Sequence, residues 1–270
     1  MNARACLHHR GRGLIVPTAL CIGIAGCATT SRTTIDDQLG LDPQDSPAAL
    51  YVEMAEEYYR RGQPEIAFRR AQQAIEADQR YPKAHVWIAL MYEEMGRAEL
   101  AAEHYRRALQ LAPNNSDILL AYGDYACRQQ RYAEADQYFK RALENPLYAT
   151  PWVPMFNAGV CAESAGDAPQ AERYFLAAVE ANPALGPALV KLAAIELRRG
   201  NPQGAKFYMD RYFEPTTLRF PRMARLALET AIQTERELGN TARAAEYEAL
   251  FRQAFPNSSV SLPPQLGSPE

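Results

Sequence analysis

A glycine followed five residues later by an alanine recurs along this chain, and this repeat restricts the fold more than any other feature of the sequence. The five pairs are Gly62 and Ala67, Gly96 and Ala101, Gly166 and Ala171, Gly200 and Ala205, and Gly239 and Ala244. The interval from Gly62 to Gly96 equals the interval from Gly166 to Gly200. A fixed period of about 20 to 50 residues indicates a stack of small structural units, each packed on its neighbours.

Within each period, small and aromatic residues alternate as expected for two packed helices. Gly123 precedes Phe139 in the third period, and Gly159 precedes Phe175 in the fourth. The small residue lets the helices approach closely, and the aromatic ring fills the space beside it. The sequence therefore predicts an all-α fold, a right-handed α-solenoid of about six helix hairpins that begin near residues 48, 82, 116, 152, 186 and 221. The alternative is an irregular helical bundle in which the spacing arises by chance.

The period and the residue pattern resemble the tetratricopeptide repeat (TPR), whose unit is about 34 residues long. Proline cannot continue a helix, and Pro113, Pro183 and Pro256 each follow a predicted second helix. Two periods are longer than this unit, so we expect inserted loops around positions 146–154 and 214–221. The solenoid is predicted to span residues 47–256, with the sixth hairpin as its cap, and residues 257–270 to form a disordered tail.

The first 46 residues have the layout of a lipoprotein export signal. A basic stretch precedes an apolar run at residues 14–25, and Ile24-Ala25-Gly26-Cys27 closes it. We therefore predict a signal peptide at 1–26, acylation of the Cys27 thiol, and a polar tether over 27–46. Ala28, which is not an aspartate, favours the periplasmic face of the outer membrane. The alternative is a signal-anchor helix in which the cysteine is incidental.

The charge and the motifs argue against catalysis and nucleic-acid binding. The chain has a formal charge of −3, and residues 1–26 hold three arginines and no acid, so the remainder is at −6. No phosphate loop or metal motif occurs, and His85 with His104 is too small a ligand set for a metal. Both histidines are expected on the surface or between helices, and acidic pairs such as Glu93 and Glu94 on solvated helix faces. We predict no enzyme activity, no cofactor and no small-molecule substrate.

Two cysteines remain after signal cleavage and acylation of Cys27. Cys127 and Cys161 fall late in the first helices of the third and fourth hairpins, which should pack side by side. In an oxidising compartment this arrangement predicts a disulfide between them. The alternative is two buried, reduced cysteines that act as small apolar residues. A distance above about 7 Å between their Cα atoms would exclude the bond.

A partner-binding groove is expected on the concave face, which the first helix of each TPR hairpin lines. The predicted groove residues are Val52, Glu56, Tyr59 and Arg60 in the first hairpin, and Val86, Leu90 and Glu93 in the second. Their apolar members would form an exposed patch suited to a helix or an extended segment. Alternatively, some of them pack against the tether or the next hairpin. Later hairpins offer a more mixed surface that includes Asp124, Arg128 and Val190.

Residues 121–167 resemble the type IV pilus biogenesis and stability lipoprotein family known as PilF or PilW. The shared features are Tyr122-Gly123, Cys127, the run Asn145-Pro146-Leu147-Tyr148 followed by Pro151, and Asn157, Gly159 and Cys161. The resemblance covers about residues 22–256, although Ala71 stands where an aromatic residue is usual. It implies a pilotin, a lipid-anchored adaptor that binds the pilus secretin subunit and promotes its assembly in the outer membrane. A TPR scaffold for another outer-membrane or cell-wall machine is the alternative.

Overall fold

The computed structural model describes residues 46–217 and 221–258, except the Arg222 side chain. The chain divides into a unit of residues 1–33 and a unit of residues 34–270, and every described residue belongs to the second. The predicted signal peptide, Cys27, the tether up to residue 45 and the tail from residue 259 onward lie outside the described residues. Within residues 46–217 and 221–258, each helix is too short or too polar to span a lipid bilayer.

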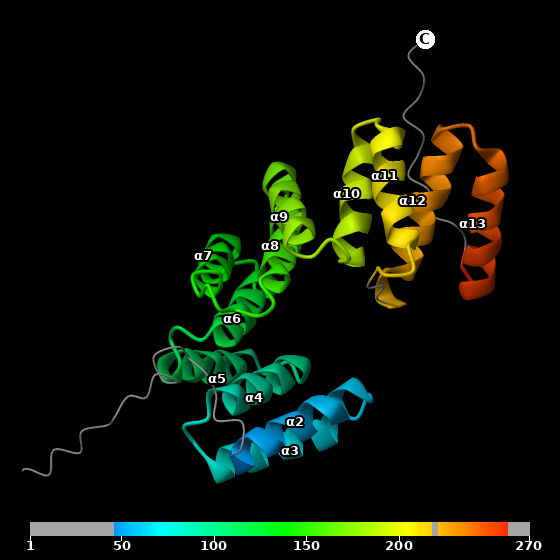
Figure 1. Cartoon of the computed structure of the whole chain (residues 1–270). Helices are drawn as coiled ribbons and strands as arrows, with labels where there is room; N and C mark the ends of the chain where they lie inside the picture. Colours follow the sequence, from blue (N-terminus) through cyan, green and yellow to red (C-terminus); the bar gives the residue numbers. More distant parts are fainter. Residues whose placement is uncertain (1–45, 218–220, 259–270) are drawn as a thin grey trace, which may run out of the picture. The chain divides into compact units, whose positions relative to one another are not determined.

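Twelve α-helices and one short 3-10 helix make up the regular structure of residues 46–217 and 221–258, which contain no strand (Figure 1). They are α2 (Pro47–Arg60), α3 (Pro64–Ala77), α4 (Pro82–Glu94), α5 (Ala98–Leu111), α6 (Ser116–Arg128), α7 (Tyr132–Ala142), α8 (Trp152–Ser164), α9 (Ala168–Ala181), α10 (Gly186–Arg198), α11 (Pro202–Phe213), η1 (Pro221–Met223), α12 (Ala224–Glu237) and α13 (Thr241–Ala254). Each even-numbered helix packs on the next to form a hairpin, and each hairpin contacts its neighbour in the sequence. The predicted all-α repeat fold is confirmed.

The recurring glycines lie at the turn between the two helices of a hairpin. Gly62, for example, has a φ of 72°, in the left-handed region that glycine occupies without steric cost. The third hairpin lacks this glycine, and Gln130 takes the same conformation with a φ of 59°. The need for one left-handed residue per turn therefore explains the regular glycine spacing. In the third hairpin Gln130 fills this position, although residues other than glycine seldom adopt this backbone conformation.

The cores of the third and fourth hairpins depend on the close approach predicted from their small residues. A Cβ atom on Gly159 would lie 2.6 Å from Cε1 of Phe175, and one on Gly123 would lie 2.8 Å from Cε1 of Phe139. Both phenylalanines are fully buried. Glycine is therefore required at these two crossings, because any larger residue would overlap the ring that fills the core.

The first predicted insertion forms a loop between hairpins, but residues 152–154 of it already belong to α8. The second falls between α11 and η1, and its residues 218–220 lie outside the described residues. The first joins Ala142 of α7 to Trp152 of α8, and the Tyr148 hydroxyl donates a hydrogen bond of 3.1 Å to Asp117 in α6. The second follows Phe213 of α11, and the chain re-enters helical structure at η1. Neither insertion interrupts a helix, so the repeat continues on both sides of each loop.

Candidate functional site: the first-helix face of the hairpins

The predicted exposure of Val52 is wrong. Only 4% of this residue is exposed, and it packs in a cluster with Ala74 of α3, with Tyr81 just before α4, and with Ala84 of α4. Val190 of α10 is likewise fully buried. The reason is the same for both: neighbouring hairpins approach closely enough to cover an apolar side chain at this helix position. The alternative reading, packing against a neighbouring hairpin, holds for Val52.

The other predicted groove residues divide into a solvent-facing set and a packed set. Glu56 and Arg60 are exposed, and Tyr59 and Leu90 are partly buried. Val86 packs against the aromatic cluster of the second and third hairpins. The apolar surface on this face is therefore smaller than the sequence suggested, and polar groups take up much of the space.

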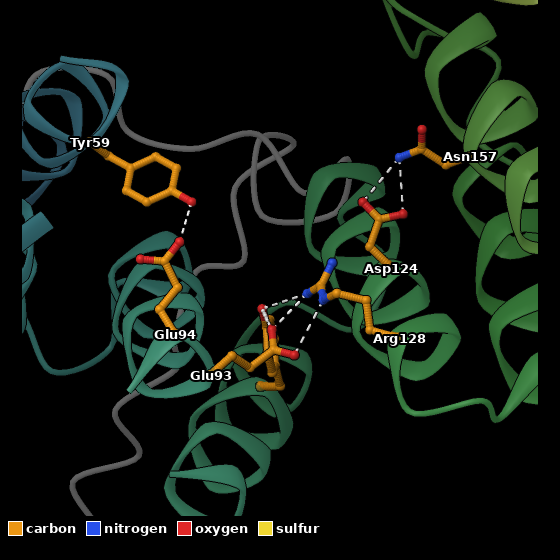
Figure 2. A network of polar contacts seen from close by, with 7 residues as sticks. Tyr59, Glu93, Glu94, Asp124, Arg128 and Asn157 are labelled. Atoms are coloured by element: carbon orange, nitrogen blue, oxygen red, sulfur yellow. Dashed lines mark hydrogen bonds and ion pairs between the residues drawn. The ribbon is translucent and has the colours of Figure 1, made fainter. Parts of the chain in front are cut away.

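Polar side chains connect the hairpins across this face, and we call them the polar ladder: Tyr59, Glu93, Glu94, Tyr105, Asp124, Arg128 and Asn157. The contacts of all of these except Tyr105 can be followed in Figure 2. The Tyr59 hydroxyl of α2 donates to Glu94 of α4. Arg128 of α6 reaches back to Glu93 of α4. Asn157 of α8 donates to Asp124 of α6. The ladder thus joins four consecutive hairpins.

The contact at Glu93 is the most connected part of the ladder. Arg128 donates through Nη2 to Oε2 at 2.7 Å and through Nε to Oε1 at 3.2 Å. The buried Tyr105 of α5 donates to Oε2 at 2.8 Å. The Glu93 side chain is only 13% exposed, so the expectation of a solvated face was wrong for this residue. A two-pronged ion pair of this kind fixes the relative position of the two helices.

Asp124 is held by a single neutral donor. Both carboxylate oxygens accept from Nδ2 of Asn157, at 2.9 and 3.0 Å. Burial raises the pKa of Asp124 to about 6, although the nearby Arg128 and the Asn157 amide lower it. The carboxylate therefore changes charge in a mildly acidic range, in the middle of the ladder.

Asp124→Asn is expected to stabilise the protein at neutral pH. The folded-state pKa of about 6 lies above the ordinary value of 3.8, so the folded protein binds this proton more tightly, and stability falls as pH rises from about 4 to about 6. The new amide keeps an acceptor for Asn157 without the buried charge. We expect the free energy of unfolding of Asp124→Asn to exceed that of the parent by ~1 to 3 kcal/mol at pH 7.5 and by almost nothing at pH 4.

Urea unfolding of both proteins between pH 4 and 8 would measure this difference. Replacing the exposed Asp210 by asparagine is the matched control. The free energies of unfolding of Asp124→Asn and the parent should differ more as the pH rises. A difference that stays constant between pH 4 and 8 would contradict the titration of Asp124.

Cys127 and Cys161 form a disulfide in the structure. Their Cα atoms are 5.8 Å apart, which satisfies the distance that the sequence analysis required. The bond ties α6 to α8 at the same junction that the Asp124 and Asn157 contact crosses. The inserted loop from Ala142 to Trp152 connects the same two hairpins, so the bond holds together a pair with a long connection.

The two histidines pair with each other between α4 and α5. Their Nδ1 atoms are 3.0 Å apart, and Nε2 of His85 lies 3.0 Å from the Gln79 carbonyl oxygen. A carbonyl only accepts, so Nε2 of His85 carries the proton and Nδ1 of His104 donates to His85. Burial and the neighbouring His85 lower the pKa of His104. Within residues 46–217 and 221–258, no group of three or more His, Cys, Asp or Glu side chains could hold a metal.

The sequence pattern pointed to six of the seven ladder residues, all except Tyr105, but not to the bonds between them. Tyr59 and Glu94 are 35 residues apart, as are Glu93 and Arg128. Asp124 and Asn157 are 33 residues apart. Polar residues separated by one repeat length, give or take one residue, are therefore the signal that could have located the ladder.

Comparison with known proteins agrees with this architecture. The tetratricopeptide repeat model matches residues 52–116 and 94–150. Type IV pilus assembly protein PilF of Pseudomonas aeruginosa is 29% identical over 157 residues, which are 58% of this chain and 61% of PilF. The chain thus aligns with less than two thirds of that relative.

Two solved structures extend the likeness over most of the described residues. The crystal structure of PilW, a widely conserved type IV pilus biogenesis factor, superposes with a TM-score of 0.66 at 28% identity, covering 79% of this chain and 96% of PilW. The structure of Pseudomonas aeruginosa PilF has a TM-score of 0.67 at 24% identity, covers 78% of this chain and 93% of that one, and supports the fold. The chain therefore has a tetratricopeptide-repeat fold, and its homologues include the type IV pilus biogenesis proteins PilF and PilW.

Proposed function

We propose that the chain is a lipid-anchored periplasmic adaptor, a pilotin, that binds the type IV pilus secretin subunit and promotes its multimerisation in the outer membrane. The homology to PilF and PilW carries the proposal, because both relatives act in type IV pilus biogenesis. The secretin as partner and the acylated Cys27 as anchor follow from the family resemblance and from the sequence of residues 1–27.

The first-helix face supports a binding role. Ladder contacts fix the positions of α2, α4, α6 and α8, so the surface that they carry needs little ordering when a partner docks. Glu56 and Arg60 are exposed beside the partly buried Tyr59, and Leu90 adds an apolar side chain on α4. Such a mixed surface suits an extended or helical segment with both apolar and charged residues.

Anchoring adds to this binding without any catalysis. An adaptor held at the membrane raises the local concentration of captured subunits, which favours their assembly into a ring. We therefore expect the deletion strain to lack pili and to leave secretin subunits unassembled.

Affinity capture from envelope extracts with the full-length lipidated chain tests the proposal. We expect the secretin subunit to be recovered, and the recovery to fall at least tenfold for Glu56→Lys and for Leu90→Glu. Glu56 is exposed, so its replacement leaves the fold intact. Leu176→Glu on α9, a residue that is 43% exposed, is the matched control for Leu90→Glu and should capture normally. Recovery of no secretin, together with normal pili in the deletion strain, would refute the pilotin role and favour a scaffold for another envelope machine.

A further inference from the structure

The last hairpin carries an apolar groove on a part of the molecule that the first-helix face does not include. A cavity of about 560 Å³ lies between the end of α11, the start of α12 and the end of α13. Its walls include Tyr212, Phe213, Ala224, Leu228, Leu250 and Ala254. Leu250 is 49% exposed. An exposed apolar groove with aromatic walls is a common feature of sites that bind peptide segments.

The aromatic wall of this groove is held in place. Phe213 stacks on Tyr247 of α13, with ring centroids 4.9 Å apart and an angle of 23° between the planes. Tyr212 is only 3% exposed and packs edge-on against Phe213 at 5.1 Å. Proline-rich segments in the polyproline II conformation dock into aromatic-lined grooves, because such a segment loses little entropy on binding.

The chain itself supplies a matching segment directly after the groove. Residues 259–270 read SVSLPPQLGSPE, with two consecutive prolines next to Leu262, and Glu270 is the only charged residue among them. A segment without charged side chains avoids the large desolvation cost that an ion would have in an apolar groove.

The last described residues lie close to the groove. Leu250, Gln253 and Ala254 of the last turns of α13 form one wall of the groove. The Ser258 amide donates a hydrogen bond of 3.0 Å to the Phe255 carbonyl, which holds the chain beside the end of that helix. The short stretch from Ser258 to Pro263 can span up to about 16 Å when extended. A tethered ligand has an effective concentration in the millimolar range, so even weak docking fills the site.

We propose that the segment Leu262-Pro263-Pro264 of this chain occupies the groove between α11, α12 and α13 and covers Leu250. The groove is then an internal peptide-binding site in the sixth hairpin, and its natural ligand class is a short, uncharged, proline-containing segment. This assignment does not depend on the proposed secretin binding, which uses the opposite end of the repeat array.

Engineered cysteine pairs in the full-length chain test this docking. Leu250→Cys combined with Leu262→Cys places one thiol in the groove and one in the segment. Ala249→Cys combined with Leu262→Cys is the matched control, because Ala249 is exposed, does not line the groove and lies at nearly the same distance along the chain. Under mild oxidation we expect the first pair to form an intramolecular bond at least ten times faster than the control. Equal rates for the two pairs would overturn the proposal.

Hydrogen exchange provides a second measurement that needs no substitution in the groove. Exchange at residues 224–254 should be faster in a chain that ends at Ser258, and in full-length Leu262→Ser with Pro263→Ser, than in the parent. Unchanged exchange in both variants would show that the segment does not cover the groove. Cross-links that form between two chains would also overturn the proposal, and would assign the groove to the segment of a second copy.

Discussion

Replacing both Cys127 and Cys161 by alanine is expected to lower the free energy of unfolding by about 3 to 4 kcal/mol, since the disulfide closes a loop across 34 residues. Cross-linking removes conformations from the unfolded chain, and its effect grows with the length of the closed loop. Alanine is the suitable replacement, because Cys161 is only 3% exposed and packs in the apolar cluster with Ala126 and Phe139. A serine hydroxyl at this position would add a cost unrelated to the bond.

Urea unfolding followed by far-ultraviolet circular dichroism would measure this loss. Cys127→Ala alone should match the double variant, because one cysteine cannot form the bond. Parent protein treated with a reductant should move toward the same unfolding midpoint. Ordinary surface substitutions change the free energy of unfolding by at most about 0.5 kcal/mol. If the free energies of the double variant and the oxidised parent differ by no more than this, the disulfide does not stabilise the fold as described.

Cys27→Ala is expected to remove the protein from the outer membrane while the solenoid remains folded. A single acyl chain binds a bilayer only marginally, but each buried CH₂ contributes about 0.8 kcal/mol, so several chains on one cysteine hold the protein firmly. Cys27 is the proposed attachment point for these chains, and the first helix of the described part begins only at Pro47. Loss of the anchor should therefore leave the packing of α2 to α13 unchanged.

Membrane fractionation and labelling with a radioactive fatty acid would test the anchor. The parent should sediment with the outer membrane and incorporate label, whereas Cys27→Ala should do neither and keep the parent's circular dichroism spectrum. Cys21→Ala, which changes a cysteine inside the predicted signal, is the matched control and should behave as the parent does. Label on Cys27→Ala would refute the assignment of this cysteine.

The regular part of the fold could be predicted from the sequence because it depends on local requirements. A left-handed turn selects glycine at positions such as Gly62, and a close helix crossing selects Gly159 opposite Phe175. Each requirement returns with every hairpin, so the period is visible in the residues themselves. Gln130 satisfies the turn without glycine, which is why the third hairpin is absent from the glycine spacing.

The binding face was harder to predict because it depends on contacts between hairpins. Val52 stands at a helix position that is expected to line the groove, yet residues at the start of α4 cover it. Glu93 has the character of a solvated acid, yet Arg128 and Tyr105 engage both of its oxygens. The position within one repeat does not determine which of these outcomes occurs, since the deciding side chain lies on the next repeat.

The polar ladder also bears on how the molecule assembles. Its bonds between successive first helices join residues 33 to 35 positions apart, so each bond can form as soon as the next hairpin is present. Proteins whose contacts are this local fold fast, because little chain entropy is lost before each contact forms. A chain that emerges N-terminus first, from a ribosome or an export channel, can therefore complete each bond as soon as the next hairpin appears. The order of the ladder along the sequence is then also its order of formation in time.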